Sequence, residues 1–167
     1  MKSRVSSLSA QLLGVEAGRL ALTALASTLW PTANRALFIP FALDVDGIIP
    51  SIYIANGAVV SGNVDVGIYN SNFQRLQAAG GIAQAGANAT QVIGLSGTSL
   101  TAGAYWAGIV LDNLVGSIMC MGGLAGAQAE QIGIFEMATA YPLPVAVTPA
   151  TPSMAILPLI TILYDRG

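Results

Sequence analysis

The chain has 167 residues, of which 54% are hydrophobic and only 8% are charged, and its formal net charge at pH 7 is −2. It contains no histidine, which excludes Ser-His-Asp and Cys-His nucleophiles as well as histidine-bound metals. Its single cysteine, Cys120, excludes an intramolecular disulfide and a cysteine-rich zinc site, and the apolar residues around it predict a buried, unreactive thiol.

Charge and hydropathy patterns also exclude two classes of partner. Nucleic-acid binding requires a basic patch, yet Lys2 is the only lysine and no cation lies between Arg75 and Arg166. A membrane-spanning helix requires about 20 mainly apolar residues, whereas the best apolar stretch here, 20–30, is too short. A secretory signal is an alternative interpretation of the N-terminus, but charged residues interrupt the segment that would have to be apolar.

Residues 1–30 are predicted to form an extended N-terminal arm that docks on another molecule. Gly14 and Gly18 interrupt the helical spacing of its apolar residues, and a short isolated helix is marginal in water. A frayed terminus is the alternative. The arm side chains expected to contact a neighbouring subunit or a shell protein are Leu8, Leu12, Leu13 and Val15.

Residues 31–167 are predicted to form a single β-sandwich domain. Apolar residues alternate with other residues over 35–46, where Pro40 indicates an edge strand or a bulge because it has no N–H to donate. A second strand is expected over 48–55, with Ile52 and Ile54 on one face. The Asn56-Gly57 dipeptide that follows is typical of a type I′ hairpin turn.

The middle of the chain contains two strong strand patterns separated by an uncharged connection. Over 64–70, Val64, Val66 and Ile68 share one face at a period of two. The connection over 77–97 is expected to hold at most one strand, near 90–95. The second pattern, 104–111, is apolar on both faces, which predicts a strand that is covered on both.

The last third of the chain predicts three more strands, over 114–121, 131–138 and 154–164. Four prolines between residues 141 and 152 predict an extended, loop-like segment. Eight or nine short strands with turn signals between them, and no convincing internal helix, predict an all-β antiparallel sandwich.

Two segments resemble β-sandwich modules of tailed-bacteriophage virion proteins: G-N-V-D-V-G-I-Y-N at 62–70 and S-L-T-A-G-A-Y-W-A-G-I-V-L-D-N at 99–113, with a polar loop between them. Such modules occur in capsid decoration proteins, head or neck fibres and tail fibres, and the similarity covers roughly 36–113. The resemblance implies a jelly-roll-like fold and a trimer. It carries no catalytic residues over to this chain.

Carboxylates and aromatic residues are the remaining candidates for chemistry. A glycosidase requires two opposed carboxylates, and the nearest pairing is Asp44 and Asp46 with Asp65 on a neighbouring strand. Asp44 and Asp46 also suggest calcium, but the residues that follow depart from the EF-hand pattern, so a solvated turn is expected. Tyr105 and Trp106 are adjacent strand residues on opposite faces, so core packing is expected rather than a shared sugar-binding platform.

Low charge and strands that are apolar on both faces predict a homotrimer, because a monomer of this composition would expose large apolar patches. The predicted function is that of a non-enzymatic structural protein of the phage virion, without cofactor or metal. It would be displayed as a trimeric capsid decoration (cement) protein or a short head or neck fibre, in contact with the major capsid protein. The alternative is a receptor-binding tail-fibre tip or a carbohydrate-binding sandwich module.

Overall fold

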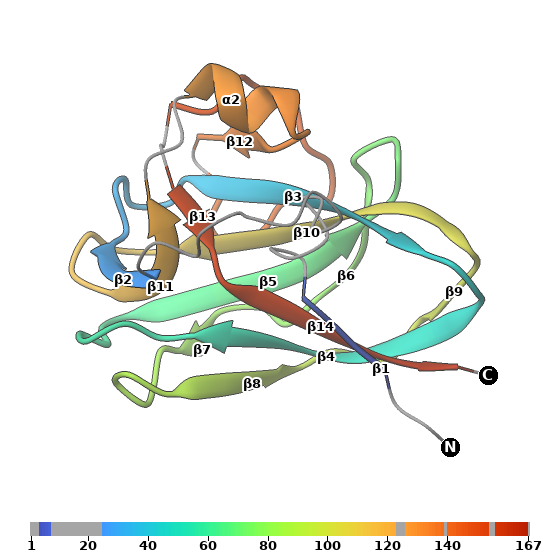
Figure 1. Ribbon diagram of the computed structural model, residues 1–167, viewed down its shortest axis with the longest axis horizontal. Helices are drawn as coiled ribbons and strands as arrows, with labels where there is room; N and C mark the ends of the chain where they lie inside the picture. Colours follow the sequence, from blue (N-terminus) through green and yellow to red (C-terminus); the bar gives the residue numbers. More distant parts are fainter. Residues whose placement is uncertain (1–3, 8–24, 123–125, 139, 154–155, 167) are drawn as a thin grey trace, which may run out of the picture.

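The computed structural model describes residues 4–7, 25–122, 126–138, 140–153 and 156–166. Most of them lie in three antiparallel sheets of five, six and three strands, accompanied by a short helix, α2 (Gly126–Gln131). Figure 1 shows the two larger sheets as the layers of a sandwich, with the three-stranded sheet at one end. The all-β antiparallel sandwich predicted from the sequence is confirmed.

The five-stranded sheet forms one layer of the sandwich. Four of its strands lie side by side in the order β1 (Arg4–Ser7), β14 (Ile160–Arg166), β4 (Gly47–Ala55) and β8 (Thr90–Gly94). The fifth strand, β9 (Ser99–Leu100), pairs with the first residues of β4.

The six-stranded sheet forms the other layer, and the three-stranded sheet closes one end of the sandwich. The larger sheet runs β12 (Phe135–Met137), β3 (Ala36–Leu43), β10 (Gly103–Leu111), β5 (Asn63–Tyr69) and β6 (Arg75–Ala78), with β7 (Ile82–Ala83) also beside β5. The smaller sheet runs β13 (Ile156–Pro158), β11 (Ser117–Gly122) and β2 (Leu25–Leu29).

The main core lies between the layers and follows the predicted alternation. Val64, Val66 and Ile68 of β5 are fully buried there, and so are Ile52 and Ile54 of β4. Because successive strand residues point to opposite faces, the sequence pattern was sufficient to assign these side chains to the core.

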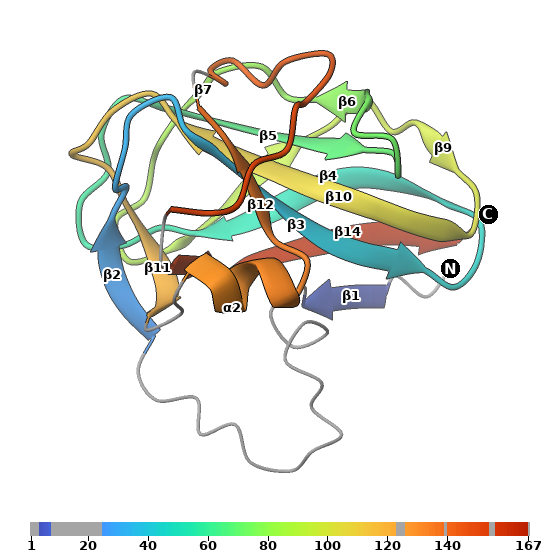
Figure 2. The ribbon, with the colours of Figure 1, turned by 90° about the horizontal axis from the view of Figure 1, so that it is seen from above.

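The outer face of the six-stranded sheet is covered by residues 140–147, which we call the strap. In Figure 2 the strap is part of the orange-to-red coil that follows β12 on the outer side of this sheet, and its backbone bonds Arg75 of β6 and Phe73 of the β5–β6 turn. Buried side chains of the strap and the sheet form a second apolar cluster, made of Ala36, Phe38, Tyr69, Val110, Ala140, Leu143 and Val147. The prediction that 104–111 is covered on both faces is therefore confirmed, but the second cover comes from the same chain. This strand does not require another copy to bury it.

Two proline positions have a clear structural reason. β12 pairs only with Ala36 to Phe38 of β3, so it does not extend as far as Pro40. The missing N–H of Pro40 therefore leaves no hydrogen bond to β12 unmade. Pro158 pairs with Cys120 at the end of β13, and β14 begins at Ile160 in a different sheet. The single strand predicted over 154–164 is therefore two strands that change sheets at the proline.

Three further predictions about elements are corrected by the structure. Asn56-Gly57 is not a two-residue hairpin, because β4 and β5 belong to different sheets and Asn56 is buried in a bridge to Ile118. The segment 131–138 contains the end of α2 and only a three-residue strand, β12. The connection over 77–97 contains β7 and the end of β6 in addition to β8, the strand expected near 90–95.

Parts of the predicted arm lie in the sheets. Residues Arg4–Ser7 form β1, which pairs with β14, and residues Leu25–Leu29 form β2, which pairs with β11. The four arm side chains expected to contact a partner, Leu8, Leu12, Leu13 and Val15, lie outside the described residues. Within the described segments, no helix is long and apolar enough to cross a membrane.

Candidate interaction surface

The carboxylates that a glycosidase would need lie far apart. Asp65 pairs with Val110, which pairs with Ala36, whereas Asp44 follows the far end of β3. The seven residue-to-residue steps from Ala36 to Leu43 span about 23 Å at roughly 3.3 Å per step, while glycosidase carboxylates lie about 5 to 10 Å apart. The nearest candidate pairing, Asp44 or Asp46 with Asp65, is therefore not formed.

Asp44 and Asp46 are exposed and stabilise the turn after β3. Asp46 Oδ1 accepts a hydrogen bond from the backbone N–H of Ala102 at 2.7 Å, and Asp44 Oδ1 accepts one from the Tyr164 hydroxyl at 3.0 Å. Among the residues that the structure describes, no group of three or more acidic or cysteine side chains is placed to hold a metal ion.

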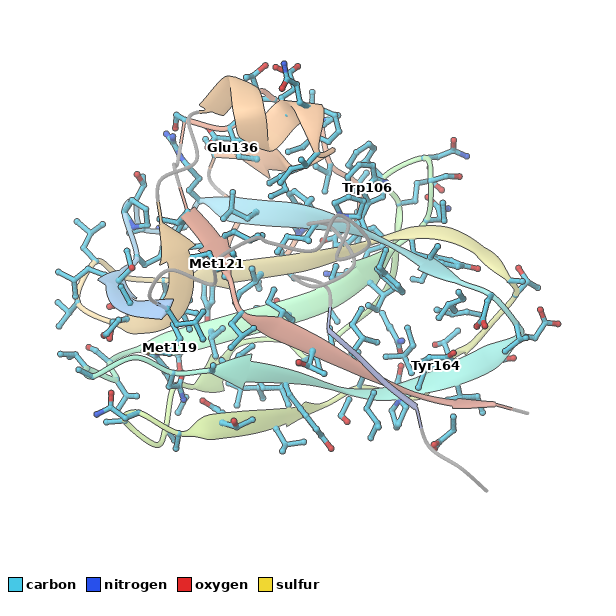
Figure 3. The ribbon with its side chains drawn as sticks, in the orientation of Figure 1. Trp106, Met119, Met121, Glu136 and Tyr164 are labelled. Atoms are coloured by element: carbon cyan, nitrogen blue, oxygen red, sulfur yellow. The ribbon has the colours of Figure 1, made fainter. Side chains whose placement is uncertain are left out.

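Tyr105 and Trp106 lie on opposite faces of β10, as their adjacent positions predict. Tyr105 is buried in the core between the layers, whereas Trp106 lies on the outer side of the sheet (Figure 3). There the Trp106 ring stacks on Phe73, with ring centroids 4.6 Å apart, and meets Phe135 edge-on at 5.3 Å. Its face is already occupied by a neighbouring ring, so it does not offer an open stacking platform.

Cys120 is fully buried and unpaired by any disulfide, as the sequence predicted. Burial raises the pKa of its thiol to about 12, against a smaller opposing effect of a hydrogen bond with Thr28. Because the thiolate is the reactive form, this cysteine is inert near neutral pH.

A hydrogen-bonded network joins the connections at the β2–β11 end of the sandwich. Gln84 Nε2 donates to Asn56 Oδ1 at 3.0 Å and to the Ser117 carbonyl at 2.8 Å, while its Oε1 accepts from the N–H of Ser61 at 3.0 Å. Asn56 Nδ2 in turn donates to the Ala85 carbonyl at 2.6 Å. Asn56 and Gln84 are both buried, so the network holds four chain segments in one arrangement.

The turn between β10 and β11 is held by side chains of its own. Asn113 Oδ1 accepts hydrogen bonds from the N–H groups of Val115 and Gly116 at 2.8 and 2.7 Å, and Asn113 Nδ2 donates to the Ser61 carbonyl at 2.8 Å. An asparagine that bonds the backbone two and three residues ahead stabilises a turn. The turn presents Leu114 and Val115 to solvent.

Four exposed apolar side chains surround the start of β11 at this end. Leu29 pairs with Ser117 across the sheet, and on the other side the Ser117 N–H bonds the Val59 carbonyl at 2.8 Å. Leu114 and Val115 precede Ser117 by two to three residues. We call these four side chains, which are 43–56% exposed, the apolar tip: Leu29, Val59, Leu114 and Val115.

The apolar tip was not identified from the sequence. The apolar run over 114–121 predicts a strand that includes Leu114 and Val115, but β11 begins only at Ser117. The available signal was Asp112-Asn113, two turn-forming residues directly before them. Leu29 and Val59 carry no local signal, since only the pairing of β2 with β11 and the closure of the β4–β5 connection bring them together. Comparisons of this chain with protein-family models, characterised proteins and solved structures found no match.

Proposed function

We propose that this protein is a non-enzymatic structural protein of a tailed-phage virion, assembled as a homotrimer. It is displayed on the particle as a capsid decoration (cement) protein or a short head or neck fibre. The resemblance of the segments at 62–70 and 99–113 to phage virion modules supports the virion, and the all-β sandwich agrees with that resemblance. The apolar tip is the structural observation that supports assembly into a homotrimer.

The apolar tip has the properties of a contact surface. Each Val or Leu side chain that becomes fully buried stabilises an assembly by about 1.5–3 kcal/mol. The network around Gln84 and Asn113 holds the backbone beneath the tip in one arrangement, so association loses little conformational entropy. The four side chains are uncharged, so burying them against another copy brings no like charges together.

The positions of the acidic groups favour a structural role over hydrolysis. Asp44 and Asp46 hold the turn after β3, while Asp65 lies near the opposite end of the sheet and binds the strap. In the virion, the trimer contacts the major capsid protein. The arm residues Leu8, Leu12, Leu13 and Val15 remain the proposed contact with the shell, because buried leucine and valine side chains offset the cost of ordering a chain.

The assembly is tested by sedimentation equilibrium at micromolar concentration. Wild type is expected at three times the 17.0 kDa chain mass, and the double variant Leu114→Ser with Val115→Ser at the mass of one chain. The matched control is Ile82→Ser with Val92→Ser, two residues that are 40% and 60% exposed on β7 and β8. A wild-type monomer, or equal dissociation of both double variants, would refute assembly through the apolar tip.

The virion role is tested by mixing the protein with purified, DNA-filled capsids that lack decoration. Retention during particle purification, and density for the sandwich at a three-fold position in a cryo-EM map, are the expected results. Loss of retention after Leu8, Leu12, Leu13 and Val15 are all changed to Ser, with an unchanged thermal midpoint, would assign the contact to the arm without removing β1 from its sheet. Absence of the wild-type protein from every particle layer would end the virion proposal.

A further inference from the structure

The Asn56-Gly57 dipeptide occurs once in the chain, and its two residues can react with each other. The backbone nitrogen of a glycine that follows an asparagine can attack the asparagine Cγ, because glycine has no Cβ to hinder the approach. The new N–C bond closes a succinimide ring, and the side-chain amide takes up the glycine proton and leaves as ammonia. Water then opens the ring to aspartate or isoaspartate. The reaction requires a mobile side chain, a free backbone nitrogen and access to water.

The side chain of Asn56 is held in place and away from water. Its Nδ2 donates to the Ala85 carbonyl at 2.6 Å and to Gln91 Oε1 at 3.0 Å, and its Oδ1 accepts from Gln84 Nε2 at 3.0 Å. The whole residue is fully buried. Its Cγ therefore cannot turn toward the Gly57 nitrogen until these bonds break.

The nitrogen of Gly57, which would be the attacking atom, is also held. Its N–H donates to the Ser117 carbonyl at 2.9 Å, and a nitrogen bound in this way keeps its proton. A Cβ added to Gly57 would lie 2.4 Å from Ser27 Oγ and 2.5 Å from Ser117 Oγ, so this part of the chain has little space in which to rotate. Both reacting groups are thus fixed in the closed fold.

Gln84 connects the two halves of this arrangement. Its Nε2 donates to Asn56 Oδ1 and to the same Ser117 carbonyl that accepts from Gly57. Gln84 and Ala85 directly follow β7, in the connection that leads to β8. When this connection moves away, Asn56 loses hydrogen bonds on both sides of its amide. Such a local opening costs less free energy than unfolding of the whole domain.

We propose that Asn56-Gly57 is a spontaneous deamidation site, which the buried network holds unreactive and which reacts when the connection after β7 opens. Conversion to aspartate puts an oxygen in place of Nδ2, so it faces the Ala85 carbonyl without a hydrogen to share. A buried charge without a donor is strongly destabilising, and isoaspartate also lengthens the backbone. The closed arrangement then cannot form again, so an opening at the end that carries the apolar tip becomes permanent.

The test follows conversion of Asn56 in the full-length protein by peptide mass spectrometry, during incubation in a mildly alkaline buffer. Wild type in native buffer is expected to convert at least about tenfold more slowly than wild type unfolded in urea, because the rate follows the open fraction. Gln84→Met should convert at least about fivefold faster than wild type in native buffer. The matched control Gln74→Met, at an exposed glutamine, should convert as wild type does.

A second control separates local opening from a general loss of stability. Val66→Ala removes methyl groups from the core between the layers, so it should lower the thermal midpoint but leave the conversion rate near that of wild type. If Gln84→Met does not fold, wild type decides: urea below the unfolding midpoint should raise the rate before tryptophan fluorescence changes.

Three results would overturn the inference. The first is conversion of native wild type as fast as that of the unfolded chain. The second is a Gln84→Met rate no higher than that of Gln74→Met or of Val66→Ala. The third is a wild-type rate that rises in urea only together with global unfolding.

Discussion

Asp112 holds Asn63 with both of its carboxylate oxygens. Oδ1 accepts a hydrogen bond from the Asn63 backbone N–H at 2.9 Å, and Oδ2 accepts one from Asn63 Nδ2 at 2.8 Å. The Asp112 N–H also donates to the Asn63 carbonyl at 3.1 Å. The pair continues the β5–β10 ladder past its last register partners, Val64 and Leu111, and fixes the start of the turn that presents the apolar tip.

The Asp112 contacts make stability depend on pH in the acid range. Burial raises the pKa of Asp112, but hydrogen bonds from Asn113 and Asn63 outweigh it, so the net shift is below the usual 3.8. A lowered pKa means that the unfolded chain binds the proton first as the pH falls. The stabilisation is therefore present above pH 3.8 and is lost as the pH falls through the folded-state pKa.

Urea unfolding of wild type and Asp112→Asn measures this contribution. The variant is expected to be less stable between about pH 5 and 7. The difference should shrink as the pH falls from about 3.8 through the lowered folded-state pKa, because below that pKa both proteins are uncharged at this position. A stability difference that stays constant from neutral to strongly acid pH would show that the Asp112 charge contributes nothing.

The buried network depends on Gln84. Replacing it by Met keeps the length of the side chain but leaves Asn56 Oδ1 and the Ser61 N–H without their partner. Each unsatisfied buried group costs about 1–3 kcal/mol, so Gln84→Met should lower the free energy of unfolding by about 2 kcal/mol or more. Gln74, which is exposed, supplies the control Gln74→Met, which should change stability little. Equal effects in chemical unfolding would contradict the role of the network.

Phe73 combines a strained backbone with a well-packed ring. Its φ of 58° lies in the left-handed region, while its ring stacks on Trp106 and meets Phe38 edge-on. Both Phe73→Ala and Phe73→Gly lose the ring contacts, but only glycine also relieves the backbone. Phe73→Gly is therefore expected to be more stable than Phe73→Ala by about 1 kcal/mol. Thermal unfolding of the two variants gives the order, and a more stable alanine variant would refute it.

β1 lies at the edge of the five-stranded sheet, next to β14 of the same chain. Ser7 lies opposite Thr161 in the register, so cysteines at these two positions are expected to form a disulfide within one chain. The experiment uses a Cys120→Ala background, with Ser7→Cys alone as the control. On a non-reducing gel the product should run as a faster monomer. A ladder of covalent oligomers from the double variant, absent from the control, would show that β1 is exchanged between copies.

Several side chains show where sequence patterns suffice and where they fail. Alternation placed Val66 and Ile54 in the core correctly, because a strand of period two shows its apolar face directly. Asn56 carries a strong turn signal, yet it is buried, because Gln84, 28 residues away in the chain, satisfies its side chain. Pro158 was included in one long strand, although the chain changes sheets there.

The sequence by itself determined the all-β class, the faces of the best-patterned strands and the absence of histidine chemistry, since composition and period-two alternation are local properties of the chain. Tertiary structure alone decided that the strap covers β10, that Leu29 and Val59 lie on either side of Ser117, and that Asp65 lies about 23 Å along the sheet from the end of β3. The physical reason is that an apolar face must be covered, but its pattern does not specify which distant segment covers it.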